Sequence, residues 1–207
     1  APPRQTWPPD VSLRETGDAI VRAAEEALSG SLDDQFVIDP FQAGAGTSHN
    51  MNVNEVLANR AEEILGGVRG AYSKVNPNDH VNMAQSTNDV FPTAMRLSSL
   101  RMMDLLEPEL ERLKNLLRLK GAEFDGILKS GRTHLQDAVP IRLGQEFEAY
   151  AAAVGKNIAG IRRCRDVLLE LGIGGTAVGT GLNAEERYIE IVVEAIGRKT
   201  GFSVRTA

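Results

Sequence analysis

Apolar residues recur at helical spacing through most of the chain. Side chains three or four positions apart form one stripe on a helix. This pattern predicts five helices, which we place at residues 18–29, 50–65, 92–124, 141–171 and 184–197. Thirty helical residues span about 45 Å, so the two long predictions indicate an elongated helical bundle. The predicted fold class is therefore mainly α, a long-helix bundle with part of a smaller N-terminal domain.

The segments between the predicted helices are polar and rich in glycine. Residues 71–90 are rich in asparagine without any period, and residues 129–136 are polar, so both are predicted as loops. Residues 172–181 carry five glycines and are also predicted as a loop. A short extended piece is expected at residues 36–38, and Pro108 is expected to kink the third helix. The wide apolar stripes on the long helices favour association into a larger bundle.

Composition narrows the class of protein. The chain has 207 residues, of which 42% are hydrophobic and 25% charged, and these values are typical of a globular domain. No apolar run reaches the roughly 18 residues of a membrane span. A net charge of −5 argues against nucleic acid as the main partner. The single cysteine, Cys164, excludes an internal disulfide, and no Cys/His cluster has zinc-ligand spacing.

Two polar loops immediately precede predicted helices. Thr47 and Ser48, within residues 44–50, offer hydroxyls at a helix start, where free N–H groups can bind a carboxylate. Residues 85–89 form a run of five hydrogen-bonding side chains, Gln-Ser-Thr-Asn-Asp. From sequence alone, helix capping is the favoured interpretation of the first loop. For the second loop, capping by Ser86, Thr87 or Asp89 and ligand binding stay equally open. The chemistry of these side chains indicates at most a small anionic ligand.

A third polar loop, residues 130–137, places His134 beside a hydroxyl, a guanidinium and a carboxylate. Histidine can hold or move a proton near neutral pH, although a structural histidine is the commoner finding. The glycine-rich run at 172–181 lacks a predicted preceding strand and a Lys-Ser/Thr pair, so a nucleotide loop is not expected there. From the residues alone, the loops favour a small anion held by hydroxyls, amides and one imidazole.

Four segments in order resemble one known family. These segments are GAGTSHNMNVNEVLANRAEEILG (44–66), NPNDHVNMAQSTNDVFPTAM (76–95), GRTHLQDAVPIRLGQEFEAYA (131–151) and GGTAVGTGLNA (174–184). Together they resemble the aspartase/fumarase superfamily, and the resemblance covers residues 18–202. Within it the chain is most similar to the aspartate ammonia-lyases (aspartases), with class II fumarases as the alternative. Four positions favour the aspartase branch over the fumarase branch: Ser48, His80, Thr87 and Val139.

The resemblance implies a reversible anti elimination that converts L-aspartate into fumarate and ammonia. A base removes a proton next to the β-carboxylate, and the resulting dianion needs strong hydrogen-bond donors. By carry-over, the β-carboxylate is bound by Thr47, Ser86 and Thr87, and the amino group by Asn88 and His134. Thr133 is expected to bind the α-carboxylate, and Thr133 and His134 are the expected catalytic residues. No cofactor and no metal site is expected.

One family signature is absent from these 207 residues. The family's GSSxMPxKxNP loop supplies the serine base and a lysine, and this sequence contains no such motif. We therefore expect an internal fragment, inactive alone, with a lead-in at 1–17, part of an N-terminal lyase domain at 18–90 and the first part of a central helical domain at 91–207. The resemblance implies a cytoplasmic homotetramer acting on a small dicarboxylate, without nucleic-acid or membrane partners. A non-catalytic structural relative is the alternative from another class.

Overall fold

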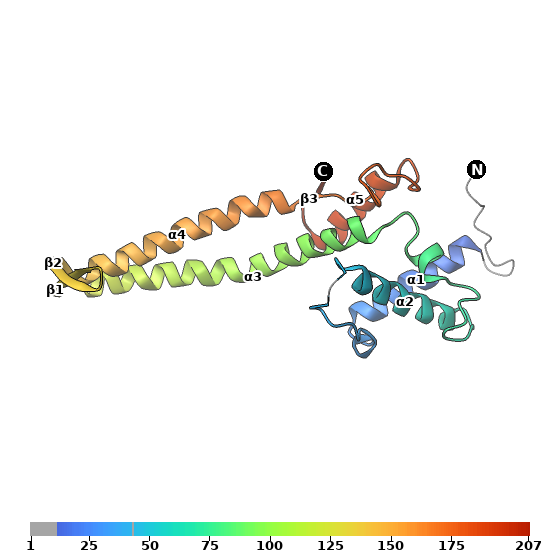
Figure 1. Ribbon diagram of the computed structural model, residues 1–207, viewed down its shortest axis with the longest axis horizontal. Helices are drawn as coiled ribbons and strands as arrows, with labels where there is room; N and C mark the ends of the chain where they lie inside the picture. The colour runs from blue at the N-terminus through green and yellow to red at the C-terminus, as the bar shows by residue number, and fades with distance from the viewer. Residues whose placement is uncertain (1–11, 43) are drawn as a thin grey trace. The chain divides into compact units, whose positions relative to one another are not determined.

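The computed structural model describes residues 12–42 and 44–207, and it is mainly helical (Figure 1). This confirms the predicted fold class. The described chain forms two compact units, and each is treated separately. The first comprises the described residues up to Ala94 with residues 172–202 and 206–207, and the second comprises residues 95–171 and 203–205. In chain order the elements are α1 (Leu13–Leu28), η1 (Asp33–Gln35), α2 (Thr47–Ile64), η2 (Pro77–Val81), α3 (Thr87–Glu123), β1 (Leu128–Thr133), β2 (Gln136–Arg142), α4 (Leu143–Leu168), β3 (Glu170–Leu171), α5 (Tyr188–Thr200) and β4 (Arg205–Thr206).

Helix α1 begins at Leu13, earlier than the predicted start at Asp18. A capping box explains the difference: the Ser12 hydroxyl accepts a hydrogen bond from the Glu15 N–H at 3.2 Å, and the Glu15 carboxylate accepts one from the Ser12 N–H at 2.9 Å. The hydrogen bonds between Ser12 and Glu15 lower the pKa of Glu15. The expected lead-in at residues 1–17 is therefore helical from residue 13, and residues 1–11 lie outside the described residues.

The core of the first unit lies between α1 and α2. Its buried residues are mostly alanines, namely Ala19, Ala23, Ala58, Ala61 and Val75. Small side chains allow two helix backbones to approach closely. Close packing of the two backbones therefore contributes more to this interface than the burial of large apolar side chains. Arg60 on α2 also binds Glu26 on α1 through two hydrogen bonds, of 2.5 and 3.1 Å. Helix α2 begins at Thr47, earlier than the predicted Asn50.

A buried carboxylate holds the segment that follows α2. Glu62 is 0% exposed and accepts hydrogen bonds from the N–H groups of Lys74 and Val75 at 2.9 and 2.8 Å, and from the N–H and hydroxyl of Ser73. Burial alone raises the pKa of Glu62, but the hydrogen bonds from Ser73, Val75 and Lys74 outweigh it and lower the pKa below 4.5. Gly67 leaves room for this carboxylate, because a Cβ added at this position would lie 2.4 Å from Glu62 Oε1.

The second unit contains a β-hairpin where a loop and the start of a helix were predicted. Strand β1 pairs antiparallel with β2, from Leu128 opposite Arg142 to Thr133 opposite Gln136. Nearly every hairpin residue is exposed, so neither face needs an apolar stripe. Period-two alternation is the usual sequence signal for a strand, and its absence explains the wrong prediction. Helix α4 consequently begins at Leu143 rather than Ile141.

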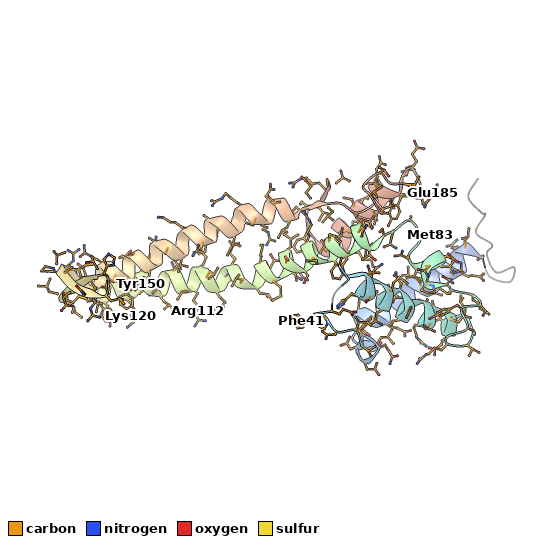
Figure 2. The ribbon with its side chains drawn as sticks, viewed as in Figure 1. Phe41, Met83, Arg112, Lys120, Tyr150 and Glu185 are labelled. Atoms are coloured by element: carbon orange, nitrogen blue, oxygen red, sulfur yellow. The ribbon has the colours of Figure 1, made fainter. Side chains whose placement is uncertain are left out.

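Side-chain ion pairs link α3 and α4 within the second unit. Arg162 on α4 lies 2.6 Å from Glu107 and 3.1 Å from Glu111 on α3, and Arg165 lies 2.6 Å from Asp104. Helix α3 continues through Pro108 as one α-helix. Arg112 on α3 and Tyr150 on α4 are both exposed, and both are labelled in Figure 2. Many apolar residues of α3 are exposed too, including Met102, Leu105, Leu106, Leu113, Leu116 and Leu119.

The remaining elements of the first unit depart from the predictions in detail. Helix α5 begins at Tyr188 rather than Ala184, because hydrogen-bonded turns from Gly181 to Ala184 and from Glu185 to Tyr188 precede it. The short 3₁₀ helix η1 ends just before the extended piece expected at 36–38, which forms no strand. One π-helical turn, η2, interrupts the predicted loop at 71–90. In the described part of the chain, no helix is both long and apolar enough to cross a membrane.

Candidate active site

A buried asparagine joins the starts of α2 and α3 in the first unit. Asn50 is 7% exposed, and its Nδ2 atom lies 3.0 Å from Thr87 Oγ1 and 3.2 Å from Asn82 Oδ1. An amide nitrogen carries two hydrogens, so both donors of Asn50 are used. Asn54 donates to the same Asn82 oxygen at 3.0 Å. This network holds the first turn of α3 against the first turn of α2.

Two neighbouring hydroxyls at the start of α3 are left with hydrogens to donate. Thr87 Oγ1 accepts from Asn50, and Ser86 Oγ accepts from the Asn88 N–H at 3.2 Å. A hydroxyl has one hydrogen and two acceptor lone pairs. Because protein N–H groups already occupy the acceptor side of Ser86 and Thr87, their O–H groups can point at a ligand. Together with the positive end of the helix dipole, this arrangement suits a carboxylate.

Helix α2, unlike α3, begins after a residue that cannot cap it with a side chain. Gly46 occupies the capping position with φ of +85° and, as a glycine, offers no side chain to cap the first turn. The alternative in which Thr47 or Ser48 caps this helix is therefore not realised. A Cβ added at Gly46 would lie 2.4 Å from the Phe91 ring, so only glycine allows this close approach to α3. Thr47 is exposed in the first turn of α2.

The glycine-rich segment 172–181 binds the start of α3. Asn88 Nδ2 donates to the Ala177 carbonyl at 2.8 Å. Asp89 is 4% exposed and accepts hydrogen bonds from the Gly174 N–H at 3.1 Å and the Thr176 N–H at 2.9 Å. Its other oxygen accepts from the Ser86 N–H at 2.9 Å, which caps α3. The capping interpretation of residues 85–89 is therefore correct, and it leaves the hydroxyl hydrogens of this turn available.

The other two predicted site residues lie in the second unit, in the β1–β2 hairpin. Thr133 ends β1, and His134 follows it in the turn, where both are exposed. His134 and Leu135 have φ of +48° and +61°, which residues with a Cβ rarely adopt. The first unit thus gathers Thr47, Ser86, Thr87 and Asn88, whereas Thr133 and His134 belong to the other unit.

Burial and charge shift two titratable groups of the first unit. Burial lowers the pKa of His80, and the negative charges of Asp79 and Glu62 oppose this shift. The Nδ1 atom of His80 accepts a hydrogen bond from the Asn76 N–H at 2.9 Å. Burial raises the pKa of the Tyr188 phenol, and the charge of Asp89 adds to this effect.

The donors in this site are hydroxyls and amides, which suit an organic carboxylate. Among the described residues, no three His, Cys, Asp or Glu side chains come together as metal ligands. The exposed thiol of Cys164 lies on α4 in the second unit. The hydroxyls and amides of the first-unit site can donate hydrogen bonds to an anion.

Sequence reasoning missed the residues that orient this site. Asn50 and Asn82 were not singled out, although both lie within the segments that resemble the family. Asp89 was noted only as a possible cap, yet its carboxylate also holds residues 174–176. The serine and the acid three residues later were the available signal for the cap. Nothing local to Asp89 identifies the glycine segment as its second partner.

Comparisons with known proteins agree with the fold. Residues 7–207 match the family described as Lyase. The chain is 54% identical over 185 residues to aspartate ammonia-lyase from Bacillus subtilis, which covers 89% of this chain and 39% of that protein. It is 52% identical over 194 residues to class II fumarate hydratase from Halobacterium salinarum, covering 93% and 41%. The chain therefore spans about two-fifths of the length of these relatives.

A solved structure gives the same answer for the fold. The crystal structure of fumarate lyase:delta crystallin from Brucella melitensis has a TM-score of 0.85 and 47% identity, covering 93% of this chain and 42% of that chain. Aspartase and fumarase relatives are similar to this chain at nearly equal identity. The match over nearly the whole chain shows that it belongs to the lyase family of the aspartase/fumarase superfamily.

Proposed function

We propose that this chain is part of an aspartate ammonia-lyase, which converts L-aspartate into fumarate and ammonia by anti elimination. The observation that carries the carboxylate-binding part of the proposal is the pair of oriented hydroxyls at the start of α3. Thr87 and Ser86 each accept a hydrogen bond from the protein, so each can donate to a substrate carboxylate. The identity of 54% to the Bacillus subtilis aspartate ammonia-lyase supports the choice of reaction.

The proposed chemistry uses these donors on the β-carboxylate. Removing the proton from the adjacent carbon places a second negative charge on that carboxylate. Preorganised donors stabilise such a charge more than they stabilise the substrate, which accelerates the step. We assign Thr47, Ser86 and Thr87 to the β-carboxylate. Electrons then return to form the double bond, and ammonia leaves from the α-carbon.

The remaining roles follow the family resemblance. We assign Asn88 and His134 to the amino group and Thr133 to the α-carboxylate. The sequence of 207 residues contains no GSSxMPxKxNP motif, which in the family supplies the serine base. We therefore propose that the 207-residue chain is inactive alone, and that activity requires a homotetramer of a protein that also carries the serine loop.

The second candidate is class II fumarate hydratase, which removes water from malate. It is supported by 52% identity to the Halobacterium salinarum enzyme. Malate carries a hydroxyl where aspartate carries an ammonium group, and both substrates have the same two carboxylates. The oriented hydroxyls of Ser86 and Thr87 serve either substrate, so they do not separate the two candidates. The residues that favour aspartate are Ser48, His80, Thr87 and Val139, all by resemblance.

A pair of hybrid enzymes separates the candidates. Residues 18–202 replace the matching segment of the Bacillus subtilis aspartate ammonia-lyase, and separately that of the Halobacterium salinarum fumarate hydratase. We expect the first hybrid to release ammonia from aspartate, and neither hybrid to dehydrate malate efficiently. Malate turnover by the second hybrid with no aspartate turnover by the first overturns the assignment in favour of fumarase.

A matched pair of threonine variants tests the site itself. Thr87→Val keeps the side-chain shape and removes one donor, so kcat of the active hybrid falls by about 100-fold. Thr93→Val is the control on the same helix, because the Thr93 hydroxyl is buried and makes no hydrogen bond to any described residue. The control is expected to keep kcat within twofold. Equal activity of the two variants contradicts the role given to Thr87.

A further inference from the structure

Asn88 can face only one way. Its Nδ2 atom lies 2.8 Å from the Ala177 carbonyl oxygen, and a carbonyl can accept but not donate a hydrogen bond. The amide nitrogen must therefore face Ala177, and Oδ1 must face away from it. Within the described residues, Asn88 Oδ1 accepts no hydrogen bond, and the side chain is exposed. The free atom of Asn88 is thus an acceptor, which suits an ammonium or amine N–H.

The position of the Ala177 carbonyl depends on Asp89. The buried Asp89 carboxylate receives the N–H groups of Gly174 and Thr176 on one oxygen and the Ser86 N–H on the other. Through these three hydrogen bonds, Asp89 joins Ser86 at the start of α3 to the backbone of residues 174–176, which directly precedes Ala177. Hydrogen bonds to a charged acceptor are about twice as strong as neutral ones. Asp89 therefore holds the segment 174–176 firmly in register with Asn88.

The opposite side of the same segment is closed by α5. Gly174 has φ of +88°, and a Cβ added at this position would lie 2.5 Å from Ile189 Cγ1. The Thr176 backbone is also left-handed, with φ of +57°, and the residue is 8% exposed. The segment is confined between Asp89 and Ile189, so it has little freedom to follow a different Asn88 orientation. Val178, by contrast, is 78% exposed at the edge of this segment.

We infer that Asp89 is a positioning residue, which acts through the backbone of residues 174–177 to present Asn88 Oδ1 to the amino group of the substrate. This inference rests on the proposed function for the identity of the ligand. Asp89 itself does not touch substrate, because its oxygens are engaged by three protein N–H groups. Its effect on the reaction is selective for the nitrogen end of the substrate, whereas Thr87 and Ser86 act on the carboxylate end.

The first test uses the 207-residue chain and needs no ligand. Hydrogen exchange by NMR is measured for the Gly174 and Thr176 amides and for the Asn88 side-chain NH₂. In Asp89→Asn an NH₂ group replaces one acceptor oxygen, and exchange at all three sites is expected to rise at least tenfold. Val178→Ala is the control and is expected to leave exchange unchanged. Unchanged exchange of the Asn88 NH₂ in Asp89→Asn overturns the inference.

A second variant covers the case in which Asp89→Asn does not fold. Gly174→Ala leaves the Asp89 carboxylate intact but displaces the backbone from the opposite side, against Ile189. Faster exchange of the Asn88 NH₂ is expected here as well. If Gly174→Ala moves the Gly174 and Thr176 amides without affecting Asn88, the segment does not orient Asn88, and the inference is wrong.

The second test uses the aspartase hybrid in the reverse direction, from fumarate and ammonium. Asp89→Asn is expected to raise KM for ammonium about tenfold while KM for fumarate stays within twofold. A loss of stability alone lowers the amount of active enzyme and changes neither KM. A parallel rise of both values contradicts the selective role of Asp89. If the unmodified hybrid does not use ammonium, the proposed function fails, and the exchange experiment still decides whether Asp89 orients Asn88.

Discussion

Replacing the buried Glu62 by glutamine tests how much one carboxylate stabilises the first unit. The substitution keeps the volume of the side chain and removes its charge. One oxygen of Glu62 accepts from the N–H and hydroxyl of Ser73, and the other accepts from the N–H groups of Lys74 and Val75. The best glutamine orientation keeps its oxygen toward Lys74 and Val75 and turns its NH₂ toward Ser73.

The expected loss of unfolding free energy depends on which hydrogen bonds this glutamine orientation removes. The Ser73 hydroxyl can rotate and accept a hydrogen bond, so only the Ser73 N–H loses its partner. One hydrogen bond to a charged group contributes about 1.5–3 kcal/mol. The bonds to Lys74 and Val75 also weaken, but the neutral amide is less costly to bury. We expect Glu62→Gln to lower the free energy of unfolding by about 2 kcal/mol, and Glu62→Ala, which removes the acceptor of the Ser73, Lys74 and Val75 N–H groups, by about 4 kcal/mol.

The assay combines urea unfolding, followed by circular dichroism, with amide exchange at Lys74 and Val75. Exchange reports the first unit locally, so the result does not depend on both units unfolding together. The pKa of Glu62 is lowered below 4.5 in the folded chain. Its charge therefore stabilises the fold above pH 4.5, and this contribution is lost as pH falls through the folded pKa. The gap between the native chain and Glu62→Gln should shrink over that range.

Glu55→Gln provides the control, because Glu55 lies exposed on the same helix. It is expected to change the free energy of unfolding by less than about 0.5 kcal/mol. The reasoning is refuted if Glu62→Gln is as mild as this control at pH 7. It is also refuted if the gap between Glu62→Gln and the native chain widens on acidification.

Substitutions at Gly67, Leu135 and Gly46 test two close contacts and one left-handed backbone position. Gly67→Ala should destabilise the native chain by about 2 kcal/mol, because an added Cβ would clash with Glu62. In the Glu62→Ala background this loss of stability should largely vanish, and a double-mutant cycle measures the difference. Leu135→Gly should stabilise the hairpin by about 0.5 kcal/mol, since glycine adopts a positive φ without strain; faster exchange of the hairpin amides contradicts this. Gly46→Ala should cost about 2 kcal/mol or more in urea unfolding, because it meets Phe91, and an unchanged midpoint contradicts the contact.

The helices were predictable because their apolar residues keep a helical period. The pattern placed α2 and α4 within a few residues of their observed ends. It failed at α1, whose start depends on the polar pair Ser12 and Glu15. It failed again at the hairpin, where Gly131 packs against the Val139 carbonyl and almost no side chain is buried. Apolar periodicity reports burial, so it cannot reveal elements that bury little.

The side chains of the candidate site were predictable, but their orientation was not. Ser86, Thr87 and Asn88 stand together in the sequence and in the structure. Which of their atoms face outward depends on Asn50 and Ala177, which come from distant parts of the chain. Local sequence carries no information on these partners. The assignments of substrate roles, and the division into lyase domains at residues 18–90 and 91–207, stay predictions.

The contact between Asp89 and Gly174 also has a consequence for the order of folding. The two residues are separated by 85 positions, so the contact closes a long loop. The entropic cost of closure grows with the logarithm of loop length and amounts to about 4 kcal/mol here, apart from a constant. Helices α1 and α2 can pair while Asp89 still faces water, since their contacts do not involve residues 172–202. The acceptor oxygen of Asn88 is therefore fixed only after residue 177 has been synthesised and folded back, so within the first unit this end of the site matures after the pairing of α1 with α2.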